Sequence, residues 1–183
     1  AALRTALFDD DSPQQTDLGG FGLFDSDILD GIEAALSLHG GDSPEIFNLS
    51  FGAVAFRDFD EQDPYDREVV AQFIDAVVTE RGKVVVVAAG NGGCPSDPTE
   101  RIEICPQTVE SPAIGYNVLA VGASDTRGTA ARSDDVIWSG SARGPAKGPL
   151  SATVLRKKPD LVAPGFGIRT TDYLGGLTDG GAG

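Results

Sequence analysis

The feature that most constrains the fold is an unbroken apolar run within residues 83–93, KVVVVAAGNGG. Its four consecutive valines occupy positions 84–87 and are bounded by Gly82 and Gly90. Valine favours strands, and a run without polar alternation is typical of a strand that is buried on both faces. Such strands occur in parallel sheets whose faces are covered by helices. The run therefore predicts the centre of a mainly parallel α/β sheet.

Helical and strand patterns alternate around this run, which is the order expected of βαβ units with parallel strands. One helix is predicted over residues 26–38 and a longer one over residues 64–82, with Asp63 as its cap and Pro64 at its first position. The longer helix carries an apolar stripe of Val69, Val70, Phe73, Ile74, Val77 and Val78. Further extended segments are expected at residues 3–8, 45–50, 117–123, 136–141, 161–165 and 167–173. We expect one domain over residues 1–183 with a three-layer αβα fold, and a tail at residues 175–183 that adds no element.

Charge and composition exclude several classes of partner. The chain has 28 acidic and 14 basic residues, a net charge of −14, whereas binding to nucleic acid requires a basic surface. No apolar run approaches the roughly 18 residues of a membrane span, and the N-terminus lacks the pattern of a signal peptide. Residues 143–160 hold most of the lysines and are expected at the surface.

The two cysteines, Cys94 and Cys105, lie in one proline-rich stretch. No CxxC spacing accompanies them and the only histidine, His39, lies far away in the sequence, so a zinc site is not expected. The pair favours a disulfide that closes this loop in an oxidising compartment, with two free thiols as the alternative.

Asn91 follows the valine-rich strand at its carboxyl end, where ligand sites of open α/β sheets lie. Its amide NH₂ can donate a hydrogen bond to a developing oxyanion, and the adjacent glycines allow close approach of another backbone. The alternative is an ordinary Asn-Gly turn. His39 falls in the last turn of the first predicted helix, where interaction with the helix dipole explains it better than catalysis.

Several stretches resemble subtilisin-like serine proteases, the subtilase family. The resemblance covers residues 45–165 and includes EIFNLSFG (45–52), VVVVAAGN (84–91), SPAIGYNVLAVGASD (111–125), SGSARGP (139–145) and KKPDLVAPG (157–165). The last two are the most specific, and all occur in the order of the family. The third stretch contains Pro112, whose counterpart is preceded by a cis peptide bond in many members.

The resemblance implies a substrate cradle and a function as a secreted endopeptidase that acts on peptides or proteins. The cradle has two walls and a floor. Ser50, Phe51 and Gly52 would pair with an extended substrate, and Ala88, Ala89 and Gly90 would form the opposite wall, although small residues also simply end strands. Glu110 aligns with the floor of the pocket for the side chain before the cleaved bond, which predicts a preference for Arg or Lys there, with an ordinary surface glutamate as the alternative. Asn91 would be the oxyanion donor.

The catalytic motifs of the family are missing from this sequence. Neither an Asp-Ser/Thr-Gly, a His-Gly-Thr nor a Gly-Thr-Ser motif is present, and His39 is followed by two glycines. We therefore expect the middle of a longer catalytic domain, inactive alone because a serine needs a general base. A non-catalytic peptide-binding scaffold is the alternative. Nucleotide binding by GNGG is disfavoured because GxGxxG spacing is absent.

No cofactor is required for the expected chemistry, but structural calcium is common in the family. By resemblance, the carbonyl groups near Ala113, Gly115 and Val118 match a weak cation site. The aspartate clusters at residues 9–11 and 25–30 lack the glycine and terminal glutamate of an EF-hand, so no ligand set is assigned. Without the family's flanking strand and central helix, apolar surface would be exposed, which predicts self-association of this chain.

Overall fold

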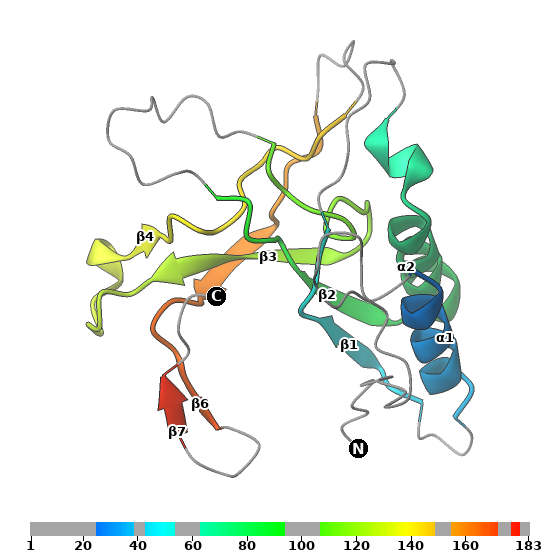
Figure 1. Cartoon of the computed structure of the whole chain (residues 1–183), viewed down its shortest axis with the longest axis horizontal. Coiled ribbons are helices and arrows are strands. Elements are labelled where there is room, and N and C mark those ends of the chain that lie inside the picture. The colour runs from blue at the N-terminus through cyan, green and yellow to red at the C-terminus, as the bar shows by residue number, and fades with distance from the viewer. Residues whose placement is uncertain are drawn as a thin grey trace, which may run out of the picture. The chain divides into compact units, whose positions relative to one another are not determined.

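The computed structural model describes residues 25–38, 43–53, 63–93, 107–148, 155–171 and 177–179 (Figure 1). It divides into two compact units, Ala1–Glu45 and Ile46–Gly183. In the described ranges, neither helix combines the length and the hydropathy that a crossing of a lipid bilayer requires. The expected strand at residues 3–8 lies outside the described residues.

The first unit contains helix α1, Asp25–Leu36, which confirms the first predicted helix to within two residues at each end. Asp25 and Asp27 lie in its first turn, where their charge favours the positive end of the helix dipole. Ile32 and Ala35 are buried, as their helical spacing predicts. His39 lies beyond the described part of this helix.

The second unit is built on a five-stranded sheet, as expected for a mainly parallel α/β fold. Its strands are β1 (Ile46–Leu49), β2 (Val84–Ala88), β3 (Leu119–Asp125), β4 (Val136–Ile137) and β5 (Leu161–Pro164). β1 pairs with β2, β2 with β3 and β3 with β5, all in parallel, whereas the short β4 pairs with β3 in antiparallel orientation. Figure 1 shows β3 at the centre of this sheet.

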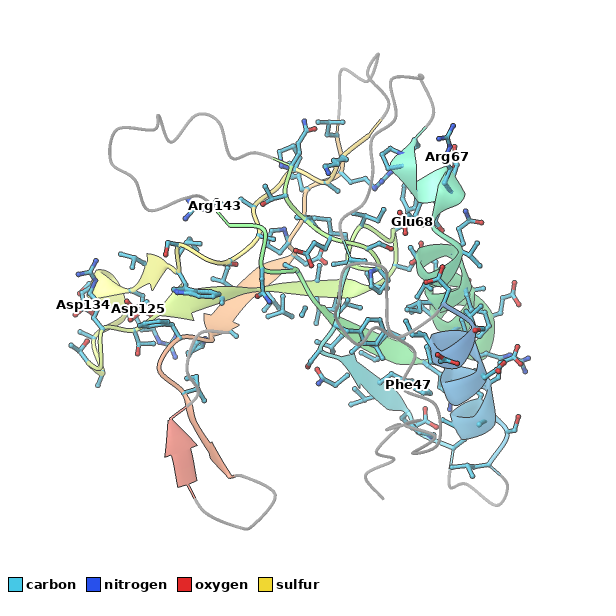
Figure 2. All side chains as sticks on the ribbon, in the orientation of Figure 1. Phe47, Arg67, Glu68, Asp125, Asp134 and Arg143 are labelled. Atoms are coloured by element: carbon cyan, nitrogen blue, oxygen red, sulfur yellow. The ribbon has the colours of Figure 1, made fainter. Side chains whose placement is uncertain are left out.

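The second predicted helix is interrupted at Glu68, so the prediction of one continuous helix is wrong. Pro64–Arg67 form a 3-10 helix, η1, in which Asp63 is the cap and accepts a hydrogen bond from the Tyr65 N–H at 3.0 Å. Glu68 has a non-helical backbone (φ −94°, ψ 86°) and lies at the junction with α2, Val69–Arg81 (Figure 2). Gly82 ends α2 in the left-handed conformation, φ 65°, as its glycine predicts.

The valine run forms β2, but only one of its faces is fully buried. Val85 and Val87 are buried, whereas Val84 is 49% exposed. Helix α2 packs against β2 and buries its own Ile74 and Val77. The expectation of a strand buried on both faces is therefore wrong for the described residues, because an unbroken apolar run records strand propensity and not which elements cover the strand.

Two further differences lie after β3. The strand predicted at residues 136–141 stops at Ile137, because Ser141 N–H donates to the Trp138 carbonyl and closes a turn. The 3-10 helix η3 (Arg132–Asp134) precedes it. The expected tail without an element is also wrong, since β6 (Arg169–Thr171) pairs with β7 (Leu177–Asp179) in a two-stranded antiparallel sheet.

Two buried charges organise the start of β3, and the sequence analysis missed both. Asp75 in α2 is 5% exposed and accepts hydrogen bonds from the Tyr65 hydroxyl at 2.8 Å and from the N–H groups of Tyr116 and Asn117 at 2.7 and 2.8 Å. Lys158 is also buried, which corrects its expected place on the surface. Each charge has partners of opposite polarity, as buried charges require.

Arg156 connects η1 to the segment before β3. Its guanidinium binds both carboxylate oxygens of Asp63, at 2.6 and 3.1 Å, and lies 4.4 Å from the ring centre of Tyr116. Burial opposes ionisation of Asp63, but hydrogen bonds from Arg156 and from the Tyr65 N–H outweigh it and hold the pKa of Asp63 below its ordinary value. Burial and the neighbouring Asp75 raise the pKa of Tyr65, so its hydroxyl stays protonated and donates to Asp75.

Candidate functional site

The ends of β1 and β2 bring the two predicted walls of the cradle to the same edge of the sheet. The strands are parallel and Leu49 is paired with Val87, so residues 50–52 and 88–90 leave neighbouring strands in the same direction. Ser50 is exposed, and its hydroxyl accepts a hydrogen bond from Asn48 at 3.0 Å. Ala89 is buried, so it contributes backbone groups to this edge and its methyl group to the core.

A third segment, residues 110–111, joins the two strand ends. Ser111 exchanges two hydrogen bonds with Ala53, of 2.8 and 2.9 Å, in an isolated antiparallel bridge. The Glu110 N–H donates to the Ala89 carbonyl at 3.0 Å. The peptide bond between Ser111 and Pro112 is cis, as the resemblance implies. Glu110 therefore lies between the ends of β1 and β2.

The Glu110 side chain occupies space that glycines leave free. A Cβ atom built on Gly52 would lie 2.9 Å from Glu110 Oε2, and one built on Gly90 would lie 2.3 Å from Glu110 Cδ. Gly90 also has φ 109°, a conformation that residues with a side chain rarely adopt. Gly90 is therefore required by both its backbone conformation and its contact with Glu110, whereas a side chain at position 52 would make the end of the Glu110 side chain move.

Asn91 is exposed directly after this edge, and its backbone is anchored. Its N–H donates to Glu110 Oε1 at 3.0 Å. On the other side, the Gly90 carbonyl accepts a hydrogen bond from the Ala142 N–H at 2.9 Å. Gly93 packs so closely against Ser139 that an added Cβ would lie 2.0 Å from the Ser139 carbonyl oxygen. The predicted oxyanion donor thus stands on a loop that is held from two directions.

The SGSARGP motif supplies one of these supports, a role that the sequence analysis did not assign. Ser141 is buried and its hydroxyl accepts a hydrogen bond from the Ala123 N–H in β3 at 2.9 Å. Its neighbour Ala142 donates to Gly90, as described above. Arg143, labelled in Figure 2, is joined to Thr108 through its backbone, N–H to hydroxyl at 2.8 Å. The motif therefore connects β3 to the loop of Asn91 and to the segment before Glu110.

The KKPDLVAPG motif has a comparable structural role. Lys158 Nζ donates to Asp160 Oδ2 and to the Val118 carbonyl, both at 2.8 Å, and the same carboxylate oxygen accepts from the Ala120 N–H at 2.7 Å. The Lys158 ammonium group therefore already donates a hydrogen bond to the Val118 carbonyl oxygen, one of the oxygens of the expected cation site. A cation there would be repelled by Lys158, so this carbonyl is a poor metal ligand in this chain.

Metal and disulfide predictions gain no structural support. Among the described residues, no group of three or more His, Cys, Asp or Glu side chains could hold a metal ion. Cys94 and Cys105 lie outside the described ranges, so their pairing stays a prediction.

The arrangement offers chemistry for binding and for polarising a carbonyl group. It combines two adjacent strand ends, an exposed amide donor at Asn91 and a carboxylate at Glu110. A histidine base for a nucleophile is not found in the described part, since the only histidine, His39, lies outside it.

The sequence and the fold of this chain are similar to those of known proteins. The model of the Subtilase family matches residues 18–183. Serine protease AprX of Bacillus subtilis (strain 168) is 36% identical over 149 residues, which cover 78% of this chain and 28% of that protein.

Two solved structures share the fold at 22% identity. The S41 psychrophilic protease has a TM-score of 0.59, and the prenylagaramide maturation protease PagA has a TM-score of 0.52. Each match covers 87% of this chain and 44% of the other, so the chain spans less than half the length of these relatives. The fold is that of subtilisin-like proteins, and since the family model covers most of the sequence, the chain belongs to the subtilase family.

Proposed function

We propose that the protein containing these residues is a serine endopeptidase and that this chain forms its oxyanion and substrate-binding part. The observation that carries the proposal is the position of Glu110, hydrogen-bonded through its backbone to one strand end and through its side chain to Asn91. Membership of the subtilase family and the relative named as a serine protease support the same reaction class.

In this proposal a peptide substrate adds to the sheet as a further strand. Residues 50–52 offer backbone groups for the pairing, and residues 88–90 border the substrate on the other side. The Asn91 amide donates to the carbonyl oxygen as negative charge develops on it. Loss of one such donor costs about 2.7–4 kcal/mol of transition-state stabilisation in comparable sites.

We infer that nucleophilic attack depends on a catalytic serine and its base, and that neither belongs to a motif found in this sequence. A serine hydroxyl becomes reactive when a base removes its proton, and the oxyanion donor alone supplies only part of the 8–23 kcal/mol by which enzymes lower barriers. The isolated 183-residue chain should therefore show no hydrolysis and no labelling by a fluorophosphonate probe. Labelling of the isolated chain would contradict this part of the proposal.

The test of the main proposal is Asn91→Ala in the full-length protein. We expect kcat to fall about 10²–10³-fold with a small change in KM, because the donor acts mainly in the transition state. Asn117→Ala, at an exposed asparagine before β3, is the matched control. A full-length protein that binds peptides without cleaving them would instead be the non-catalytic scaffold.

We further propose that Glu110 selects Arg or Lys before the cleaved bond. Its Oε2 lies 2.9 Å from where a Cβ of Gly52 would be and 2.6 Å from that of Gly90, so a cationic side chain between the walls would meet a partly buried carboxylate. Glu110→Gln should lower the ratio of kcat/KM for Arg over Phe substrates about tenfold or more, with Glu80→Gln on the exposed face of α2 as the control. An unchanged ratio would make Glu110 an ordinary structural glutamate.

Other parts of the proposal concern the environment of the protein. We infer an extracellular protein with a Cys94–Cys105 disulfide, no cofactor in the chemistry, and structural calcium only where other residues supply ligands.

We also infer that the isolated chain self-associates. The support is a group of exposed apolar side chains on and after β4 and β5, namely Val136, Ile137, Leu161, Val162, Phe166 and Ile168. A monomer by light scattering at all concentrations would contradict self-association.

A further inference from the structure

We propose that Glu110 also positions the oxyanion donor, so that one carboxylate sets both substrate preference and the placement of Asn91. The inference rests on the proposed function and adds a second task for the same side chain. Glu110 acts here through Asn91 and not on the reacting atoms. It is therefore a positioning residue in this role.

The loop that carries Asn91 cannot hold itself in place. Asn91 lies between Gly90 and the pair Gly92 and Gly93, and glycines leave a backbone with more conformational freedom than any other residue. In the described part of the chain, two hydrogen bonds restrain the backbone near Asn91: the Gly90 carbonyl accepts from the Ala142 N–H, and the Asn91 N–H donates to Glu110 Oε1 at 3.0 Å. The second of these acts on Asn91 directly and depends on a side chain.

The backbone that carries the Glu110 side chain is itself held in place. The neighbours of Glu110 on both sides are buried, Val109 at 1% and Ser111 at 5% exposure. The Glu110 N–H is fixed to Ala89, and Ser111 is bridged to Ala53. The carboxylate is therefore presented from a backbone that Ala89 and Ala53 hold in place, which is what precise placement of a donor requires.

The two carboxylate oxygens face different neighbours. Oε1 accepts from Asn91 and lies 3.5 Å from where a Cβ of Gly92 would be. Oε2 lies 2.9 and 2.6 Å from the corresponding positions on Gly52 and Gly90, between the two walls. Anchoring and recognition are thus assigned to separate oxygens of one side chain, and two substitutions can separate them.

The experiment compares Glu110→Gln and Glu110→Asp in the full-length protein, with Arg and Phe substrates and separate kcat and KM. Gln keeps an acceptor oxygen at the same reach and removes the charge, so it should lose the Arg preference and keep kcat on Phe within about threefold. Asp keeps the charge but is one methylene shorter, so its kcat on Phe should fall about 10–100-fold while part of the Arg preference remains.

A double-substitution test identifies Asn91 as the route of the effect. In the Asn91→Ala background, Glu110→Asp should have no further effect on kcat for Phe substrates, because the anchor then holds no donor. Additive losses would overturn the inference, since a merely structural role of Glu110 would act in both backgrounds. Glu80→Gln should leave all parameters unchanged.

The two levels of the proposal fail differently. If the unsubstituted full-length protein hydrolyses no peptide, the proposed function fails and the positioning role fails with it. If it does hydrolyse peptides but Glu110→Asp keeps full kcat on Phe substrates, the endopeptidase proposal stands and only the positioning role of Glu110 is overturned.

Discussion

Asp75 and Glu110 are two carboxylates in the same unit, and their surroundings differ. Asp75 is 5% exposed and three donors converge on it, from Tyr65, Tyr116 and Asn117. Glu110 is only partly buried, and in the described part of the chain only its Oε1 accepts a hydrogen bond, from Asn91. A carboxylate whose oxygens are already engaged by the protein holds the fold together, whereas one with an oxygen left between two strand ends is available to a ligand.

The largest effect expected from this contrast is on stability. Asp75→Ala would leave two backbone N–H groups and a tyrosine hydroxyl without their acceptor, which should cost about 3–5 kcal/mol in the free energy of unfolding. Glu110→Ala should cost less than about 1 kcal/mol, because its single partner can turn to water. Urea unfolding of both variants measures the difference, and equal losses would remove the distinction between the two carboxylates.

A smaller effect is expected at the second buried charge. Lys158→Ala removes the ammonium from Asp160 and from the Val118 carbonyl, and we expect a loss of about 2 kcal/mol, below the range for a fully buried pair because Asp160 is 33% exposed. The control is Lys157→Ala at an exposed position. If Lys158→Ala were neutral and calcium then stabilised the variant, the Val118 carbonyl would be a cation ligand after all.

The smallest effect concerns pH. The pKa of Asp63 is lowered from 3.8 in the folded state, so its ionised form stabilises the protein above about pH 4 and this contribution is lost as pH falls through the lowered pKa. Asp63→Asn should therefore flatten the decline of the unfolding midpoint below pH 4. Asp66→Asn, on an exposed residue of η1, should not change that decline. Identical pH profiles of the Asp63→Asn variant and the unsubstituted protein would show that ionised Asp63, paired with Arg156, adds nothing to the stability of the folded state.

The central strand and the helical segment before it could be predicted from the sequence because their signals are local. The valine run, the Gly82 stop and the Asp63–Pro64 start each depend on neighbouring residues, and all three are found in the structure. The break at Glu68 could not be predicted, since its neighbours keep a helical apolar spacing across it. The exposure of Val84 depends on which elements cover the sheet, which a run of valines does not record.

The candidate site was predicted only in part. Asn91 followed from its position after an apolar strand, whereas the two strand ends and Glu110 entered by resemblance. Asn91 and Glu110 are 19 positions apart, and no periodic pattern in the sequence predicts their contact. Lys158 and Asp75 look like surface charges in the sequence, because their burial depends on partners 40 or more positions away in the chain.

The close fit between Glu110 and Gly52 has an evolutionary consequence. A methyl group at position 52 would lie 2.9 Å from Glu110 Oε2, so a substitution at either position changes the space available to the other. In a combinatorial library at these two positions, a larger residue at 52 should survive selection only in clones where 110 has become small.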